Sequence, residues 1–244
     1  MSRFKMTIQY DGTLYHGWQV QNNAVSIQST VQNAMQELCG RRLDITGCSR
    51  TDSGVHANEY CYHFDYDGTI TDTAFPNALN TKLPQDISAV HCEKVADDFH
   101  ARYSVQKKRY VYKFYTGKVR SPFLRSYAYH TKHSLDAELM NEAAQKFCGK
   151  YDFAAFCASG SSVENTERTV CSSYVERNGD IVSFYVEADG FLYNMVRIMA
   201  GTLLFVSQGK IGVDDIVGII KSKNRDNAGP TVPPHGLYLD KVFY

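Results

Sequence analysis

The spacing of apolar residues changes twice in the first hundred residues, and this change restricts the fold more than any other feature. Residues 4–10 and 58–66 alternate polar and apolar side chains, as strands with one buried face do. Residues 26–39 between them carry apolar side chains at helical spacing. A second helix over residues 71–82 and a strand near 87–95 complete a β-α-β-β-α-β-like order. This order predicts an antiparallel sheet with helices over one face.

The second half of the chain repeats this pattern of strands and helices. Asn178-Gly179 lies between two alternating runs and is the strongest short-range signal for a β-hairpin. The elements predicted here are strands at 107–116, 169–177, 181–188 and 236–244 and helices at 134–148, 191–208 and 213–223. We therefore expect the α+β class, with an N-terminal domain of residues 1–104 and a C-terminal domain of residues 105–244.

Composition excludes several classes of protein. The 244 residues are 43% hydrophobic and 21% charged, which is typical of a globular protein rather than a disordered one. No apolar run reaches the ~20 residues that cross a bilayer, and Met1–Tyr10 lacks the continuous apolar stretch of a signal peptide. The seven cysteines include no CxxC pair. These features favour a cytoplasmic protein with reduced thiols.

Charge is balanced overall, with 26 basic and 26 acidic side chains, but it is unevenly distributed. No acidic residue occurs in Phe99–Leu135, where lysines and arginines alternate with aromatic side chains. Clustered cations neutralise phosphates, and aromatic rings stack on unpaired bases, so this stretch is suited to RNA. The alternative is a solvated pair of strands whose acidic partners come from elsewhere in the chain.

The residues most suited to chemistry lie in a predicted turn, Gly47–Ala57. Arg50, Asp52 and His56 fall within seven residues there, more functional groups than a turn requires. The alternative is that Asp52 caps the turn and that Arg50 pairs with a carboxylate.

This segment, Arg50-Thr51-Asp52-x-Gly54-Val55-His56-Ala57, resembles the signature of the TruA family of tRNA pseudouridine synthases. The resemblance covers the whole chain. Further similar motifs stand in the family's order at residues 10–19, 98–102, 108–112, 191–201 and 229–239. Cys48-Ser49 before Arg50 is a mild departure from the family, in which Ala-Gly is common.

The resemblance implies an isomerase that converts uridine to pseudouridine at positions 38, 39 and 40 of the tRNA anticodon arm. It implies a homodimer with RNA spanning both subunits, and Asp52 as the nucleophile, attacking either C1′ of the ribose or the base. For the fold, we expect two ferredoxin-like halves forming a continuous mixed or antiparallel sheet, with helices on one side and a central RNA-binding cleft.

Three further residues receive roles from the resemblance. Arg197 would lie beside Asp52 as an ion pair that keeps the carboxylate charged. Tyr110 would pack against the target base and help to move the C5 proton, or would simply be a core aromatic. Arg50 would contact RNA or brace the turn. His56 and His100 are expected to serve loop structure or RNA contact.

The reaction needs no metal or cofactor, and the sequence contains no phosphate-binding glycine-rich loop or HExxH motif. His130 and His133 are the nearest approach to a metal-ligand pair. The competing hypothesis is a non-catalytic RNA-binding protein on a ferredoxin-like scaffold, which would need neither Asp52 nor Arg197.

Overall fold

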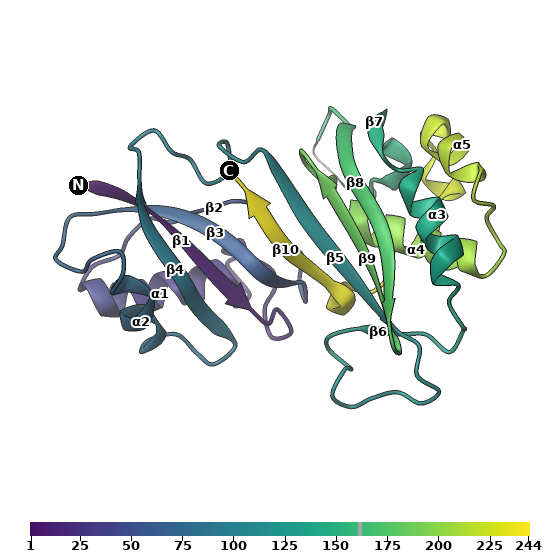
Figure 1. Ribbon diagram of the computed structural model, residues 1–244. Coiled ribbons are helices and arrows are strands. Elements are labelled where there is room, and N and C mark those ends of the chain that lie inside the picture. Colours follow the sequence, from purple (N-terminus) through teal and green to yellow (C-terminus); the bar gives the residue numbers. More distant parts are fainter. Residues whose placement is uncertain (161–162) are drawn as a thin grey trace. The chain divides into compact units, whose positions relative to one another are not determined.

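The computed structural model describes residues 1–160 and 163–244, which form two compact units. The first unit comprises Met1–Gln106 together with Tyr238–Tyr244, and the second comprises Lys107–Leu237 (Figure 1). This division differs from the expected domains at the C-terminal end of the chain. The last strand returns to the first unit, where Tyr238 pairs in parallel with His56.

The first unit contains a sheet in which β1 lies between β4 and β3, while β2 and β10 both pair with β3. The order β4-β1-β3-β2 is antiparallel throughout, as a ferredoxin-like βαββαβ unit requires. The elements are β1 (Ser2–Tyr10), α1 (Ile27–Cys39), β2 (Thr46–Gly47), β3 (His56–Tyr66), α2 (Phe75–Asn80), β4 (Ile87–Val95) and β10 (Leu237–Phe243).

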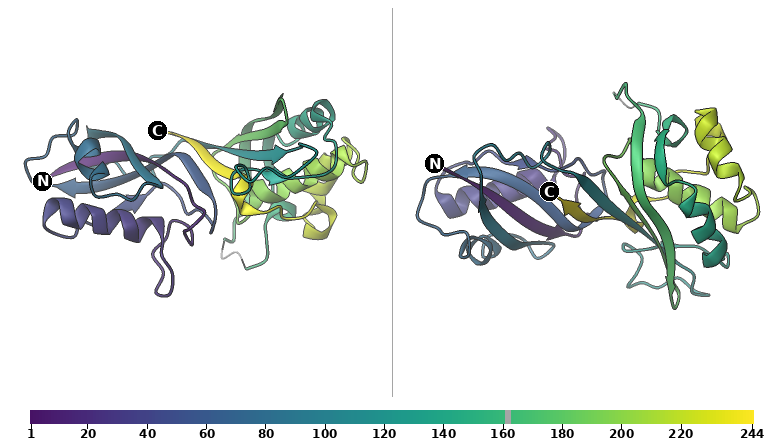
Figure 2. Two further views of the ribbon diagram at one scale, coloured as in Figure 1. Left: turned by 90° about the horizontal axis from the view of Figure 1, so that it is seen from below. Right: turned by 45° about the horizontal axis from the view of Figure 1, so that its top comes forward.

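Both helices of this unit cover the same face of the sheet. The Tyr62 hydroxyl of β3 lies 3.5 Å from the sulfur of Met35 in α1, and Phe64 packs edge-on against Phe75 in α2. Figure 2 (left) shows α1, in purple, lying along this face. The predicted first helix is confirmed, with Ser26 as its N-cap and Gly40 ending it at a φ of 71°.

Helix α2 is shorter than the predicted 71–82 because of Pro76. A proline is tolerated only in the first turn of a helix, since it lacks an N–H and clashes with the preceding turn. The helix therefore begins at Phe75, with Pro76 in its first turn. Residues 71–74 form a turn in which Thr71 accepts hydrogen bonds from the N–H groups of Ala74 and Phe75.

The second unit contains the strand order β5-β9-β8-β7, with β6 paired in parallel with β5. The predicted hairpin is confirmed: β8 and β9 flank Gly179, which has a φ of 58°. The elements are β5 (Lys107–Tyr115), β6 (Tyr129–His130), α3 (Ala137–Gln145), β7 (Gly149–Asp152), β8 (Glu167–Asn178), β9 (Ile181–Ala188), α4 (Met195–Ser207), α5 (Asp215–Ser222) and three short 3-10 helices at Ala154–Phe156, Arg225–Asn227 and Pro234–Gly236.

Helices α3, α4 and α5 lie on one side of these strands in Figures 1 and 2. Tyr112 and Phe114 of β5 are fully buried, as expected for core residues. The long helix was predicted to begin at residue 191 but begins at Met195. The cause is Asn194, whose φ of 59° is left-handed and cannot continue a right-handed helix.

The α+β class with mainly antiparallel strands is confirmed. None of the described helices has both the length and the apolar character needed to cross a membrane. The arrangement of the two halves, and with it the central cleft, stays a prediction.

Candidate active site

The loop between β2 and β3 carries two of the predicted site residues. Arg50 is exposed, Asp52 is partly exposed, and Thr51 between them is buried. The buried Thr51 holds the loop against the core, while part of the Asp52 surface beside it stays accessible to solvent.

The backbone beside Asp52 is anchored through Thr51. The Thr51 hydroxyl is hydrogen-bonded to the Tyr10 hydroxyl at 2.9 Å, and its carbonyl oxygen accepts from the Trp18 N–H at 3.2 Å. Trp18 is itself buried and stacks on Tyr60 with 4.1 Å between ring centroids. The residue before Asp52 is therefore tied to the aromatic core of the first unit.

The other side of Asp52 is held by a close crossing of two chain segments. The carbonyl oxygen of Tyr15 accepts from the Gly54 N–H at 3.2 Å and from the Ser53 hydroxyl at 3.3 Å. Gly17 has a φ of 80°, and a Cβ there would overlap the carbonyl oxygen of Thr51. Glycine is required at this crossing for two reasons, its backbone conformation and the absence of a side chain.

Tyr15 also fixes its own segment. Its hydroxyl donates to Asp86 at 2.7 Å. Burial and this hydrogen bond raise the pKa of Tyr15 well above its ordinary value, so the phenol stays protonated and keeps donating.

His56 and His100 hold loops. His56 is buried; its Nδ1 accepts from the Gly12 N–H at 3.0 Å and lies 3.1 Å from an Asp11 carboxylate oxygen. A ring nitrogen that accepts a hydrogen bond carries no proton, so in this arrangement Nδ1 does not donate to Asp11. The Nδ1 of His100 accepts from the N–H groups of Arg102 and Tyr103. Both rings thus bind loop backbone, which is one of the two roles expected of them.

Arg197 lies in the first turn of α4, in the second unit. Its Nε donates to the carbonyl oxygen of Val232 at 2.8 Å, and its Nη1 donates to the Asn194 side chain at 2.6 Å. Burial raises the pKa of Tyr112 well above its ordinary value, and the nearby charge of Arg197 opposes this. These two hydrogen bonds hold the guanidinium itself. The sequence analysis predicted neither acceptor.

The segment that binds Arg197 is itself anchored to the core of the second unit. The Tyr112 hydroxyl donates to the carbonyl oxygen of Pro233 at 2.8 Å. The Gly229 N–H donates to the Thr202 hydroxyl at 2.9 Å. A Cβ on Gly201 would overlap the carbonyl oxygen of Pro230. The sequence signal for this crossing is the pair of glycines in the motifs at 191–201 and 229–239.

Tyr110 lies on β5 and is buried, with its ring packed edge-on against Phe191 at 4.9 Å between centroids. The four predicted site residues therefore divide between the units. Arg50 and Asp52 share one loop of the first unit, and Tyr110 and Arg197 belong to the second. The ion pair between Asp52 and Arg197 stays a prediction.

Part of the acid-free stretch has an acidic partner that sequence analysis did not identify. Lys107 Nζ lies 2.6 Å from one carboxylate oxygen of Glu187, and Arg109 Nη1 lies 3.6 Å from the other. The hydrogen bond to Glu187 raises the pKa of Lys107. Glu187 faces Arg109 across β5 and β9, so a correct strand register would have revealed it. For Lys107 and Arg109, the alternative interpretation is therefore correct: they lie on a strand whose acidic partner comes from elsewhere in the chain.

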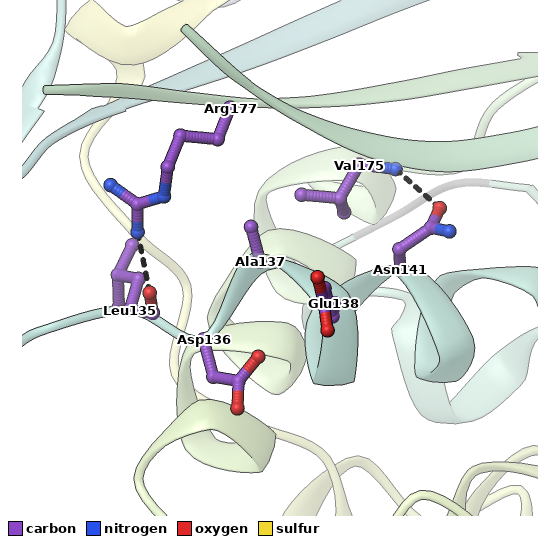
Figure 3. A pocket seen from close by; sticks show the side chains of 7 residues that line it. All are labelled: Leu135, Asp136, Ala137, Glu138, Asn141, Val175 and Arg177. Atoms are coloured by element: carbon purple, nitrogen blue, oxygen red, sulfur yellow. Dashed lines mark hydrogen bonds between the residues drawn. The ribbon is translucent and has the colours of Figure 1, made fainter. Parts of the chain in front are cut away.

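A pocket of about 440 Å³ in the second unit contains none of the predicted site residues (Figure 3). Arg177 donates to the carbonyl oxygen of Leu135, and the Val175 N–H donates to Asn141. Asp136 and Glu138 place two carboxylates in its lining, which disfavours a phosphate. Among residues 1–160 and 163–244, no cluster of three His, Cys, Asp or Glu side chains could hold a metal ion.

Comparison with known proteins places this chain in a family. A family model described as tRNA pseudouridine synthase matches residues 6–104 and 143–244. Proteins named tRNA pseudouridine synthase A from Thermoanaerobacter sp. (strain X514) and Acetivibrio thermocellus are 46% and 47% identical over 244 residues. A protein named tRNA pseudouridine synthase A 2 from Clostridium perfringens is 46% identical. Each alignment covers 100% of both chains. The chain therefore belongs to the tRNA pseudouridine synthase family.

Proposed function

We propose that this chain isomerises uridine to pseudouridine at positions 38, 39 and 40 of the tRNA anticodon arm, with Asp52 as the nucleophile. The observation that carries the proposal is the setting of Asp52. It is a partly exposed carboxylate on a loop whose neighbouring residues are bonded to Tyr10, Tyr15 and Trp18. Loops on rigid scaffolds are where catalytic groups usually lie.

The reaction exchanges one glycosidic bond for another. The bond between C1′ and N1 breaks, the uracil turns, and C1′ bonds to C5. C5 then loses its proton and N1 gains one, so the product is an isomer of the substrate. A carboxylate can assist by attacking C1′ or by adding to the base. Both routes require Asp52 to be ionised and regenerate the carboxylate at the end.

Arg197 would supply the charge that keeps Asp52 ionised. An arginine remains protonated at any physiological pH, and an opposite charge within about 4–6 Å lowers the pKa of a carboxyl group. The bonds from Arg197 to Val232 and Asn194 support this role, because they hold the guanidinium in one orientation. Such a group need not reorganise during the reaction.

Tyr110 and Arg50 would act on the nucleotide. The target uridine must leave its stack, which costs a few kcal/mol and is easiest in loops and weak stems. The buried Tyr110 would offer its ring edge and hydroxyl to the uracil and assist the departure of the C5 proton. The exposed Arg50 would contact the RNA backbone or the space that the base leaves.

The motif resemblance also supports a homodimer in which one tRNA spans both subunits. Because the substrate is tRNA, we place the reaction in the cytoplasm. Sedimentation of the chain with and without tRNA tests the dimer.

The decisive experiment is mass-spectrometric mapping of pseudouridine in unmodified tRNA transcripts treated with the wild-type chain and with Asp52→Asn. The amide keeps the shape of the carboxylate but cannot act as a nucleophile. We expect product at positions 38–40 with the wild type. With the variant we expect none, and tRNA affinity within a few-fold of wild type.

Asp44→Asn is the matched control, because Asp44 is an exposed carboxylate in the same unit. It should leave product formation unchanged. Residual activity of Asp52→Asn above about a tenth of wild type would remove Asp52 as the nucleophile. Tight binding of tRNA by a wild-type chain that forms no product would favour the non-catalytic RNA-binding protein.

A further inference from the structure

The chain makes a long excursion between β5 and β6. We call residues 116–128 the β5–β6 loop; Figure 1 shows it as the wide teal loop that ends at β6. Its base is closed by parallel pairing of Phe114 with Tyr129 and by a contact of 3.0 Å between His130 Nε2 and the carbonyl oxygen of Gly117.

The loop has internal order although most of it faces solvent. The N–H groups of Tyr127 and Ala128 donate to the carbonyl oxygen of Leu124 at 2.9 and 3.0 Å. Arg125 donates to the carbonyl oxygen of Pro122 at 3.0 Å. Bonds of this kind set the backbone of the loop before any partner binds, which lowers the entropy cost of binding.

Two kinds of side chain project from this ordered loop. Lys118, Arg120 and Arg125 are exposed, and none of them forms an ion pair with the described residues. Phe123 is 85% exposed and Val119 is 75% exposed. At this exposure the Phe123 ring is not part of the core, and its face is open to a partner.

The cations of the β5–β6 loop differ from those at the start of β5. Lys107 and Arg109 share the carboxylate of Glu187, so one of their two positive charges is already balanced within the second unit. The loop contains no acidic residue. The acid-free stretch therefore divides into a strand portion that is paired internally and a loop portion that offers positive charge outward.

We infer that the β5–β6 loop is an RNA contact surface, in which Lys118, Arg120 and Arg125 neutralise phosphates and Phe123 stacks on an unpaired base. This inference rests on the proposed function for the identity of the partner as tRNA. Charge complementarity favours RNA over a protein partner, since three cations without an acid would repel most basic surfaces and attract a polyanion. An aromatic face between cations is the usual arrangement for holding an unpaired base.

Salt dependence of tRNA binding tests the cations. In Lys118→Gln/Arg120→Gln/Arg125→Gln, the slope of log affinity against log salt should fall by about two to three, because each neutralised phosphate contributes about 0.7–0.9. Lys82→Gln/Lys94→Gln/Lys221→Gln is the control with the same change of charge on exposed lysines. It should keep the wild-type slope and the wild-type rate of product formation.

Phe123 variants test stacking. Phe123→Ala should weaken tRNA binding by about 5- to 150-fold, the range measured for loss of a stacked aromatic. Phe123→Trp should bind as wild type does, and Phe123→Leu should behave like Phe123→Ala, because leucine is apolar but has no π-face. The melting temperature should not change in any of the three.

Three results would overturn the inference: an unchanged slope in the loop triple variant, unchanged affinity in Phe123→Ala, or a change of sedimentation in Phe123→Ala at wild-type tRNA affinity. The last would identify the loop as a protein contact. Each of these measurements is accompanied by an assay showing that the wild-type chain forms pseudouridine. Absence of product from the wild type would instead contradict the proposed function, so the two failures are distinguishable.

Discussion

The loop that carries Asp52 and the helix turn that carries Arg197 are held in different ways. Around Asp52, the bonds described above fix the neighbouring residues, through Tyr10 to Thr51 and through Tyr15 to Gly54. Around Arg197, the bonds reach the functional group itself. The bonds described around Asp52 thus act on the backbone of its loop, whereas those described around Arg197 act on its guanidinium.

This difference predicts where each half of the proposed site is vulnerable. Substituting a glycine or a hydroxyl-bearing residue near Asp52 should displace the Asp52 carboxylate even though Asp52 itself is unchanged. Arg197 should be displaced mainly by losing its own side chain or the segment that accepts from it. Variants of each kind can be compared directly.

The largest effect is expected for Arg197→Met, which keeps the length of the side chain but removes its charge. Removing one preorganised group that stabilises charge in an active site lowers the rate by about 10²–10³-fold, and we expect a loss of activity of that size. The affinity for tRNA should change far less. Because Asp52 would then ionise at a higher pH, the acid side of the activity profile, between about pH 4 and 6, should shift to higher pH than in the wild type.

Single-turnover rates across that pH range measure this effect. Arg177→Met is the control, since Arg177 is an exposed arginine in the same unit whose partners lie outside the proposed site. A pH profile of Arg197→Met parallel to that of the wild type would show that Arg197 does not set the ionisation of Asp52.

Tyr110→Phe sharpens the assignment in the second unit. The ring and its contact with Phe191 are retained, so the free energy of unfolding should change only by the contribution of one buried hydroxyl, about 1–2 kcal/mol. Turnover should fall by about 10²-fold, the lower end of general acid–base contributions, if the hydroxyl assists proton transfer. Rates measured at saturating tRNA decide this, and near-normal turnover would leave only a stacking contact.

Gly17→Ala probes the backbone that positions Asp52. The new methyl group would overlap the carbonyl oxygen of Thr51, and alanine is strained at a φ of 80°. We expect the free energy of unfolding to fall by roughly 2–4 kcal/mol, from strain and overpacking together. Urea denaturation measures this value.

Gly40→Ala separates the two causes. Gly40 also has a left-handed φ, of 71°, but nothing lies within 4 Å of a Cβ built there. It should cost only about 1 kcal/mol. Equal losses at the two positions would mean that the contact between Gly17 and Thr51 is unimportant.

Modest effects are expected for Tyr10→Phe and Tyr112→Phe, one in each unit. Each removes a single buried hydroxyl that supports the site, the first at Thr51 and the second at Pro233. Each should lower the free energy of unfolding by about 1–2 kcal/mol. Turnover should fall by more in Tyr10→Phe, because Thr51 precedes Asp52 directly; the reverse order would contradict the comparison above.

Local signals in the sequence were sufficient for most elements of the fold. A strand predicted near 87–95 is β4, Asn178-Gly179 predicted the β8–β9 hairpin, and helical apolar spacing over 26–39 predicted α1. These features depend on neighbouring residues, so a single chain shows them. The starts of α2 and α4 were misplaced, because Pro76 and Asn194 impose backbone constraints that apolar spacing does not reveal.

The family, and through it Asp52 as a candidate nucleophile, followed from motifs in the sequence alone, since residue type and order suffice to carry a resemblance. Tertiary structure decided which charges pair and which segments cross. Glu187 meets Lys107 across 80 positions of the chain, and Gly201 accommodates Pro230. It also decided that β10 pairs with β3. Such contacts depend on strand register and on chain return, which are properties of the packed core. No local pattern specifies them, because each partner contributes only half of the interaction.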